Sequence, residues 1–485
     1  MGPVGARKAW RIKVKLMKPS VLLTYLLAAT FIPLAVAVAA GPKPLSMDQA
    51  IEESLKNSPV LAASGYDVER AKLASKQAFT SFLPSLDTSY TYTRADEAPS
   101  IELAGNSYQT GSMHSYAWQT KVSQPLFTGF KLLSMYEAAK LGVDLARIQD
   151  LTSRLDLVLA VKTTYFDILN AQKALEVAYS EVTQLESNLK TTKDFYDVGI
   201  VPINDVLKVE VRLAAAQQAV VRSQGLVRVN ISRLNTLMAR PVDSPLAVED
   251  ILSHKRVNRE MSKLRVVAQA NRPEIKEIDL QLGIADKQVT QAQSGYYPSL
   301  SLYWAYTASS DTPLLGESKY YDPSSWAVVT SLEWNLFSWG ATGHQVGQER
   351  AKMLKLKALR RNLLNQIDLE VKSAIVALDE SDKNIITARA SVRQAKENYR
   401  ITNERFKEQL STQTEVLDAQ TLLTQAQTSY YQALVNYNQA SAKLVRAMGL
   451  GLPGQAKPAA PAKMREKKLS SLERMEPGLA AGRAS

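Results

Sequence analysis

The sequence of 485 residues predicts a mainly α-helical protein with a β-barrel part, built from a duplicated helix–strand–strand–helix unit. Three observations carry this prediction. Apolar residues recur every seven positions along two long segments of the chain. The same spacing returns 210 residues further on. Between the helical segments of each half, the apolar spacing changes to strict alternation, which is typical of strands.

The seven-residue spacing occupies ten positions in each half, and all of them are apolar or aromatic in both copies. Such a spacing forms the seam of a coiled coil, because 3.5 residues per turn keep one stripe facing a partner helix. A shared register argues against unrelated amphipathic helices and predicts one long helical hairpin per half. The positions are Ile168, Leu175, Val182, Leu189, Tyr196, Val206, Leu213, Val220, Val227 and Leu234, then Leu378, Ile385, Val392, Tyr399, Phe406, Val416, Leu423, Tyr430, Tyr437 and Leu444.

The net charge of +12 first suggests a nucleic acid or an anionic lipid as partner. Most of this charge lies at the two ends of the chain, so the residues 41–450 carry only +2 and no basic patch for nucleic acid stands out. The chain has no cysteine, which excludes disulfides, thiol chemistry, a cysteine zinc site and a lipidated N-terminal cysteine.

Residues 1–40 have the pattern of an export signal. A basic start is followed by the apolar run Val21 to Ala37, and Ala37, Ala39 and Ala40 offer a small-residue cleavage site. A retained membrane helix is the alternative, but the run is near the lower limit of about 17–20 residues for spanning a bilayer. We therefore expect an exported protein.

Each half contains two alternating segments between its helices. These segments run from Leu86 to Thr93, Ser115 to Val122, Leu300 to Thr307 and Trp326 to Asn335. Strands of about 10 residues with one apolar, aromatic-rich face are typical of outer-membrane barrels, and two separated pairs make a poor soluble sandwich. The residues expected to form an aromatic belt at the bilayer interface are Tyr90, Tyr92, Tyr116, Trp118, Trp304, Tyr306, Trp326 and Trp334.

Four strands cannot close a barrel, and lipid does not tolerate an open sheet edge. The chain must therefore assemble with other copies of itself. Two copies would supply eight strands and leave almost no lumen, whereas three would supply twelve and leave a pore.

The helical segment from Lys131 to Asp197 contains no proline and is rich in polar residues. As one straight helix it would be about 100 Å long, far longer than a bilayer is thick. We therefore expect it to stand in water. The short helices match at an offset of 214, since Leu83-Pro84-Ser85-Leu86 corresponds to Tyr297-Pro298-Ser299-Leu300. The four-residue difference falls in the strand-pair segment.

These patterns divide the chain into nine segments. They are the signal (1–40), the first short helix (41–83), the first strand pair with its loop (84–127), the first long hairpin (128–238), a linker (239–265), the second short helix (266–297), the second strand pair with its loop (298–338), the second long hairpin (339–449) and a basic tail expected to be disordered (450–485).

The turns between the long helices and their return helices carry a family resemblance. The first turn reads Tyr196-Asp197-Val198-Gly199-Ile200-Val201-Pro202, and the second reads Phe406-Lys407-Glu408-Gln409-Leu410-Ser411-Thr412. With the duplication and paired strands, this resembles the TolC-type outer-membrane efflux and secretion channels over residues 44–450. The resemblance implies a homotrimer with a twelve-stranded transmembrane β-barrel and a coiled-coil α-barrel of twelve helices in the periplasm. It also implies a periplasmic adaptor and an inner-membrane pump of RND or ABC type as partners.

The resemblance also implies two sets of site residues. The adaptor-docking turn of the family matches Val198, Gly199 and Ile200, while the second turn has Gln409 where glycine is usual, followed by Leu410. The acids of the periplasmic gate match Asp205, Glu415 and Asp418, and the bulky positions near the tip match Tyr196 and Phe406. Ser411 stands where a basic residue helps to lock the gate in the family.

The gate acids have a simpler interpretation as well. Glu415 and Asp418 lie at the start of a helix, where acids are favourable beside the N-terminal dipole. Three copies would also bring these carboxylates around one axis, where like charges attract cations and resist dry closure. Spacing by three residues puts both acids on one face, so the two interpretations are compatible.

No motif in the sequence indicates catalysis. His114, His254 and His344 are far apart and match no metal-ligand spacing, and Gly340-Ala341-Thr342-Gly343 lacks the lysine of a phosphate loop. We expect a passive channel rather than an enzyme, with no cofactor and no metal. The alternatives are a periplasmic coiled-coil adaptor of an export system, which usually has one hairpin, and a soluble coiled-coil scaffold.

Overall fold

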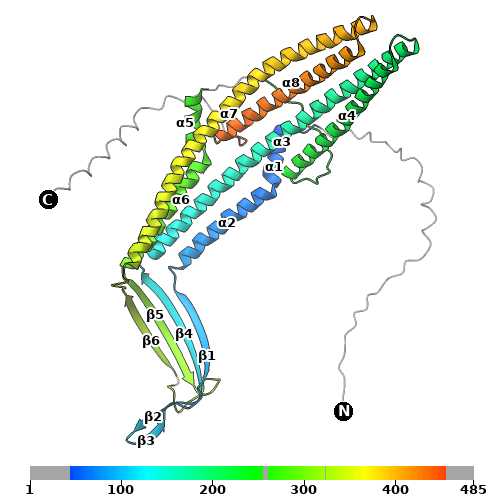
Figure 1. Cartoon of the computed structure of the whole chain (residues 1–485). Coiled ribbons are helices and arrows are strands. Elements are labelled where there is room, and N and C mark those ends of the chain that lie inside the picture. The colour runs from blue at the N-terminus through cyan, green and yellow to red at the C-terminus, as the bar shows by residue number, and fades with distance from the viewer. Residues whose placement is uncertain (1–43, 255–259, 323, 455–485) are drawn as a thin grey trace, which may run out of the picture. The chain divides into compact units, whose positions relative to one another are not determined.

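The computed structural model describes residues 44–254, 260–322 and 324–454, and the residues from Pro44 onward form one structural unit. The predicted export signal and most of the predicted tail lie outside the described residues. In chain order the elements are α1 (Met47–Asn57), α2 (Pro59–Thr80), β1 (Ser85–Arg94), β2 (Ser100–Leu103), β3 (Asn106–Gln109), β4 (His114–Phe127), α3 (Lys131–Asp197), α4 (Ile203–Leu237), α5 (Met261–Asn271), α6 (Pro273–Gln293), the 3-10 helix η1 (Ser294–Tyr296), β5 (Ser299–Ser310), β6 (Ser325–Glu333), α7 (Ala341–Lys407) and α8 (Gln413–Ala447) (Figure 1).

The duplicated helix–strand–strand–helix unit is confirmed. The long helices α3 and α7 each have 67 residues, and the return helices α4 and α8 each have 35. Each long helix packs along its own return helix, and α3 also packs against α8, so the two hairpins lie side by side (Figure 1). Seam residues such as Ile168, Leu234 and Leu378 are buried, as the heptad spacing predicts.

The four longer strands form one antiparallel sheet in the order β1-β4-β5-β6. The two predicted strand pairs are thus joined through β4 and β5, where Thr120 lies opposite Tyr306. Residues directly opposite each other share a face, so the register puts the predicted aromatic residues of all four strands on one side of the sheet. Tyr90 lies opposite Trp118 in the first pair.

The structure corrects three details of the predicted elements. The first short helix is broken at Ser58–Pro59 into α1 and α2, as the second is broken at Arg272–Pro273. The polar loop after β1 contains a small hairpin, β2–β3, that the pattern did not predict. Strand β6 ends at Glu333, so Trp334 follows the strand instead of ending it.

Two apolar clusters hold the helices together in the middle of the unit. One joins α5 to α7 and α8, and the other joins α1 and the linker to α3 and α4. Tyr165 anchors the second cluster: its hydroxyl lies 2.8 Å from the carbonyl oxygen of Leu45 and accepts from the backbone N–H of Glu249 at 2.9 Å. Leu45 and Val248 form a parallel bridge beside it, so the linker packs against the side of α3.

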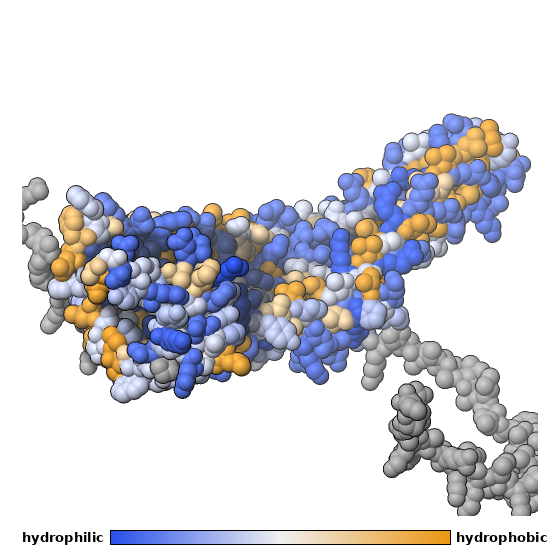
Figure 2. Space-filling model, turned by 90° about the horizontal axis from the view of Figure 1, so that it is seen from below, coloured by the Kyte–Doolittle hydropathy of each residue, from blue (hydrophilic) through white to orange (hydrophobic). Residues whose placement is uncertain are grey.

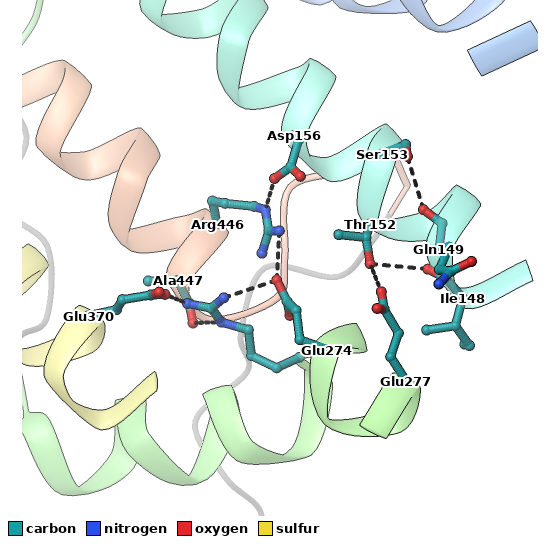
Figure 3. Close-up of polar contacts among 11 residues, drawn as sticks. Ile148, Gln149, Thr152, Ser153, Asp156, Glu274, Glu277, Glu370, Arg446 and Ala447 are labelled. Atoms are coloured by element: carbon teal, nitrogen blue, oxygen red, sulfur yellow. Dashed lines mark hydrogen bonds and ion pairs between the residues drawn. The ribbon is translucent and has the colours of Figure 1, made fainter. Parts of the chain in front are cut away.

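A charged junction ties the second half to α3 (Figure 3). Arg446 of α8 donates to Asp156 of α3 and to Glu274 of α6, both at 2.7 Å. Arg272 donates to Glu274 at 3.1 Å, to the carbonyl of Ala447 at 2.7 Å and to Glu370 of α7. Burial alone raises the pKa of Glu274, but hydrogen bonding and the two guanidinium charges outweigh it and hold that pKa below its ordinary value.

Within the described ranges, no helix combines the length and the apolar character that crossing a membrane requires.

Candidate functional site

Both tip turns have the same backbone geometry. In the first, the N–H of Ile200 donates to the carbonyl of Phe195 at 2.8 Å, and in the second, the N–H of Leu410 donates to that of Arg405 at 2.7 Å. This bond closes a left-handed C-terminal cap, which requires a positive φ at the residue before. Gly199 supplies it at +78° and Gln409 at +62°. Gln409 therefore takes the backbone conformation of the usual glycine.

The predicted docking residues lie on the surface of these turns. Val198, Ile200 and Leu410 are exposed apolar side chains at the ends of the hairpins. Exposed apolar residues clustered at a tip are typical of a contact surface for another protein.

Each predicted gate acid lies at the first turns of a return helix. The carboxylate of Glu415 accepts from the backbone N–H of Thr412 at 3.2 Å, and the Thr412 hydroxyl accepts from the N–H of Glu415 at 3.3 Å. Glu415 is therefore part of a capping box, and its side chain is still exposed. Asp418 is exposed one turn further along α8. Asp205 at the start of α4 pairs with Lys208 at 3.0 Å.

The two bulky tip residues have different surroundings. Tyr196 is 42% exposed, whereas Phe406 is only 3% exposed and packs against Phe195, with ring centroids 5.6 Å apart. These residues occupy equivalent heptad positions, 210 residues apart. In this chain Phe406 lies between the hairpins, and Tyr196 remains available to other contacts.

A polar contact layer between the two hairpins was missed by the sequence analysis. Arg212 of α4 pairs with the buried Glu181 of α3 at 3.2 Å and donates to Thr421 of α8 at 2.9 Å. Nearer the tip, the buried Thr192 donates to Gln413 at 3.0 Å. Polar residues at buried positions of a coiled coil fix which helices pair and in what register, because an unpaired partner is costly.

The predicted belt residues of the strands form a network of aromatic contacts on one face of the sheet. Tyr92 stacks on Tyr116 with centroids 4.9 Å apart, and Trp118 meets Tyr306 edge-on at 5.8 Å. The ring of Trp304 stacks on Tyr306. Trp326 lies opposite Tyr306 and is exposed, as is Trp334 beyond the strand. On the other face, Lys121 lies over the ring of Tyr303 at 4.3 Å.

No group of three or more potential metal ligands occurs among the described residues. His254 pairs with Asp382, and His114 contacts the hydroxyl of Tyr92. Both histidines therefore have structural partners.

The fold is that of outer-membrane channels. The outer membrane channel CmeC of Campylobacter jejuni superposes with a TM-score of 0.73 at 18% identity, covering 85% of this chain and 87% of that one. CusC gives a TM-score of 0.71 at 16% identity over 84% and 92% of the two chains.

The chain belongs to the outer membrane efflux protein family, whose model matches residues 50–240 and 264–450. It is 23% identical to outer membrane protein TolC of Escherichia coli over 365 residues, which is 71% of each chain. It is 24% identical to toxin and drug export protein A of Aggregatibacter actinomycetemcomitans over 339 residues, covering 67% of this chain and 70% of the relative. These findings confirm the predicted fold class and the predicted function as an outer-membrane exit duct for efflux or secretion.

Proposed function

We propose that three copies of the chain form a passive duct, in which a twelve-stranded barrel in the outer membrane continues into a periplasmic tunnel of long helices. The observation that carries this proposal is the sheet. Strands β1 and β6 are its two edges, and neither has a further strand partner among the described residues. The aromatic face of the sheet is largely exposed as well. An open sheet edge is not tolerated in lipid, so both edges would have to pair with other copies. Three copies would supply twelve strands, which is enough to leave a lumen.

The aromatic face would contact lipid, and the other face would line the lumen. The lumen-facing residues are mostly Ser, Thr, Ala and Gln, with Asp87, Lys121 and Glu333 as the charged ones in the four strands. A polar interior with an apolar exterior is the pattern of water-filled barrels. The residues 1–40 would export the chain and then be removed.

The tips of the hairpins would dock a periplasmic adaptor through Val198, Gly199, Ile200, Gln409 and Leu410. Through that adaptor the duct would work with an inner-membrane pump of RND or ABC type. Exposed apolar turns support this role. The duct itself would be passive, because its sequence has no phosphate-binding loop with which it could bind a nucleotide and use the energy of its hydrolysis.

The same tips would form the gate. Glu415 and Asp418 would meet their copies around the axis, with Asp205 and Tyr196 nearby, and Phe406 would support the hairpin from inside. The basic lock residue of the family is replaced by Ser411, whose hydroxyl donates to the carbonyl of Thr402 at 3.0 Å. Arg212, tied to Glu181 and Thr421, would hold the hairpins together instead.

Membrane fractionation and planar bilayers test this function. The exported chain is expected in the outer membrane as a trimer, and the purified trimer is expected to form water-filled pores with discrete conductance steps. A periplasmic adaptor or scaffold would instead be recovered in the soluble periplasmic fraction without pore activity, and that result would refute the proposal.

A further inference from the structure

The two halves of the sheet have the same strand register. Leu86 of β1 lies opposite Val122 of β4, and Leu300 of β5 lies opposite Leu332 of β6. Adding 214 to a β1 number and 210 to its β4 partner gives the β5–β6 pair, and this holds from Ser85↔Ser123 to Thr93↔Ser115. The sequence offsets therefore describe a structural equivalence.

The joint between the halves has no such counterpart within one chain. It pairs β4 with β5, for example Lys121 opposite Ala305. Adding 210 to the residue numbers of β4 gives β6, and subtracting 214 from those of β5 gives β1. Within one chain β1 and β6 are the two edges of the sheet, so this equivalent joint requires a second copy.

We propose that β6 of one copy pairs antiparallel with β1 of the next in the register set by β4 and β5. This register places Ser331 opposite Thr91 of the next copy and Leu332 opposite Tyr90 of the next copy. It rests on the proposed trimeric duct and specifies how its barrel closes. A shift by one residue would bring polar residues against the aromatic face, so only shifts by an even number of residues keep both faces continuous. Among these, the proposed register is the one that repeats the pairing of β4 with β5.

The same offsets predict complementary contacts between helices. In the chain, α3 packs against α6, and Asp144 and Leu280 line one hollow between them. Their counterparts are Leu354 of α7 and Tyr66 of α2, which are 60% and 76% exposed. Two large apolar side chains that are exposed in one chain would thus cover each other between copies. Figure 2 shows apolar residues in separate patches on a hydrophilic surface.

Nearer the tips the predicted contacts are complementary in charge and in polarity. Asn170 forms a hydrogen bond of 2.9 Å with Gln432 within the chain. The offsets turn this into a contact between Glu380 of one copy and Arg222 of the next copy. These two residues are exposed and of opposite charge. The contact of Arg212 with Thr421 becomes Leu422 with Val211 of the next copy, whose exposed fractions are 54% and 72%.

The equivalence is broken at the bend between strand and helix. A Cβ on Gly129 would lie 2.8 Å from the carbonyl oxygen of Ser294, so only glycine fits there. The counterpart of Gly129 is Trp339, which is exposed in the chain. The contact between copies must therefore be wider at this bend than the contact between halves, to admit the indole.

Cysteine pairs test the register, since the chain has no cysteine of its own. Ser331→Cys is combined in turn with Thr91→Cys, Ser89→Cys or Thr93→Cys in the full chain, assembled in membranes and mildly oxidised. Opposed residues have Cβ atoms about 4.5–5.5 Å apart and diagonal ones about 7–8 Å, so only the first pair approaches disulfide geometry. We expect covalent dimers and trimers from Ser331→Cys with Thr91→Cys, at several-fold higher yield than from the shifted pairs.

The pair Ser301→Cys with Ser331→Cys is the matched control, because these residues lie opposite each other within one chain. It should oxidise without joining copies. Preferred linkage of Ser331→Cys to Ser89→Cys or Thr93→Cys would overturn the register while the trimer and its pores persist. Absence of linked copies, with the trimer intact and the control oxidised, would overturn it too. A chain that forms neither trimers nor pores would overturn the proposed function and the register with it.

Discussion

Glu415 combines a local and a proposed global role in one carboxylate. It closes the capping box at the start of α8, where Thr412 is the N-cap residue. An N-cap of this type stabilises a helix by about 0.5–2 kcal/mol. Its exposed side chain also lies one turn from Asp418 at the tip of the hairpin. Truncating Glu415 would therefore weaken the helix and remove a gate charge together, so a test of the gate must keep the cap.

The double variant Glu415→Gln with Asp418→Asn separates the two roles. Glutamine preserves the capping hydrogen bond to Thr412, and both substitutions remove charge. A carboxylate about 10 Å from an ion contributes about 0.4 kcal/mol in water before screening. Losing two carboxylates from each of three copies should lower the ratio of cation to anion permeability several-fold at low salt, measured as the reversal potential in planar bilayers.

Glu69→Gln on α2 is the control, because Glu69 forms an exposed ion pair with Lys72 far along the chain from the tip. It should leave the reversal potential unchanged. If the double variant at the tip behaves like this control, the gate assignment of Glu415 and Asp418 is wrong.

The tip also shows which site residues a sequence can predict. The turn motif correctly predicted where the first turn and the start of α8 lie, because both depend on local backbone geometry. The docking role of Val198 to Ile200 and the gate role of Glu415 and Asp418 stay predictions. The heptad pattern placed Tyr196 and Phe406 as equivalents, but it did not predict that only Phe406 is buried. That difference, like the hydrogen bond of Arg212 to Thr421, depends on how the two hairpins pack against each other.

At the scale of elements, the long helices were predictable because their heptad signal accumulates over many turns. Short features carry less signal. The break before Pro59 was missed. A proline is also accepted in the first turn of a helix, so its presence alone did not show that one helix ends and another begins there. The hairpin β2–β3 turns at Ala104 and Gly105, both at positive φ. Its strands have only four residues each, which is too short for alternation to be a clear signal. Ala-Gly between Leu103 and Asn106 was the available signal.

The end of α8 rests on the junction of α5 and α6, and Gly449 makes this possible. Its φ is +71°, and a Cβ would lie 2.7 Å from the backbone nitrogen of Arg272 and from the backbone of Asn271. Gly449→Ala must therefore shift the backbone or the helix end. We expect destabilisation by about 1–3 kcal/mol, measured as a lower thermal unfolding midpoint of the assembled protein.

Gly142→Ala is its matched control within α3. Nothing lies within 4 Å of a Cβ at Gly142, and alanine favours the helix by about 1 kcal/mol. The midpoint should stay the same or rise. Equal midpoints for the Gly449 and Gly142 variants would show that the helix end is not held against Arg272 and Asn271.

At the scale of the whole molecule, each copy has one internal joint, which is the contact between its two halves. In the proposed assembly each half would also form one side of a joint with a neighbouring copy. The internal joint is polar near the tip, with Arg212, Glu181 and Thr421. In the proposed register, its counterpart between copies would pair Leu422 with Val211 and be apolar. Polar residues at a buried joint fix the partner and the register of the helices inside the chain, whereas an apolar joint lacks this constraint on the register. Opening of the tip should therefore begin between copies and leave each pair of hairpins together.

The predicted contact of Glu380 with Arg222 of the next copy allows a reciprocal test of the whole assembly. Glu380→Arg or Arg222→Glu alone would bring like charges together at all three joints. An exposed pair contributes about 0.2–1 kcal/mol, so losing it at three joints should weaken the trimer by about 0.6–3 kcal/mol. The measurement is the temperature at which the trimer dissociates in mild detergent. The double exchange restores opposite charges and should recover most of the loss.

Lys193→Glu is the control for the charge itself. Lys193 pairs with Glu210 at 2.7 Å between α3 and α4 of the same chain, so its reversal disturbs a hairpin and no joint between copies. It should leave the dissociation temperature of the trimer near that of the unmodified protein. If both single exchanges and the double exchange lower that temperature additively, Glu380 and Arg222 do not meet, and the helices of neighbouring copies pack in another register.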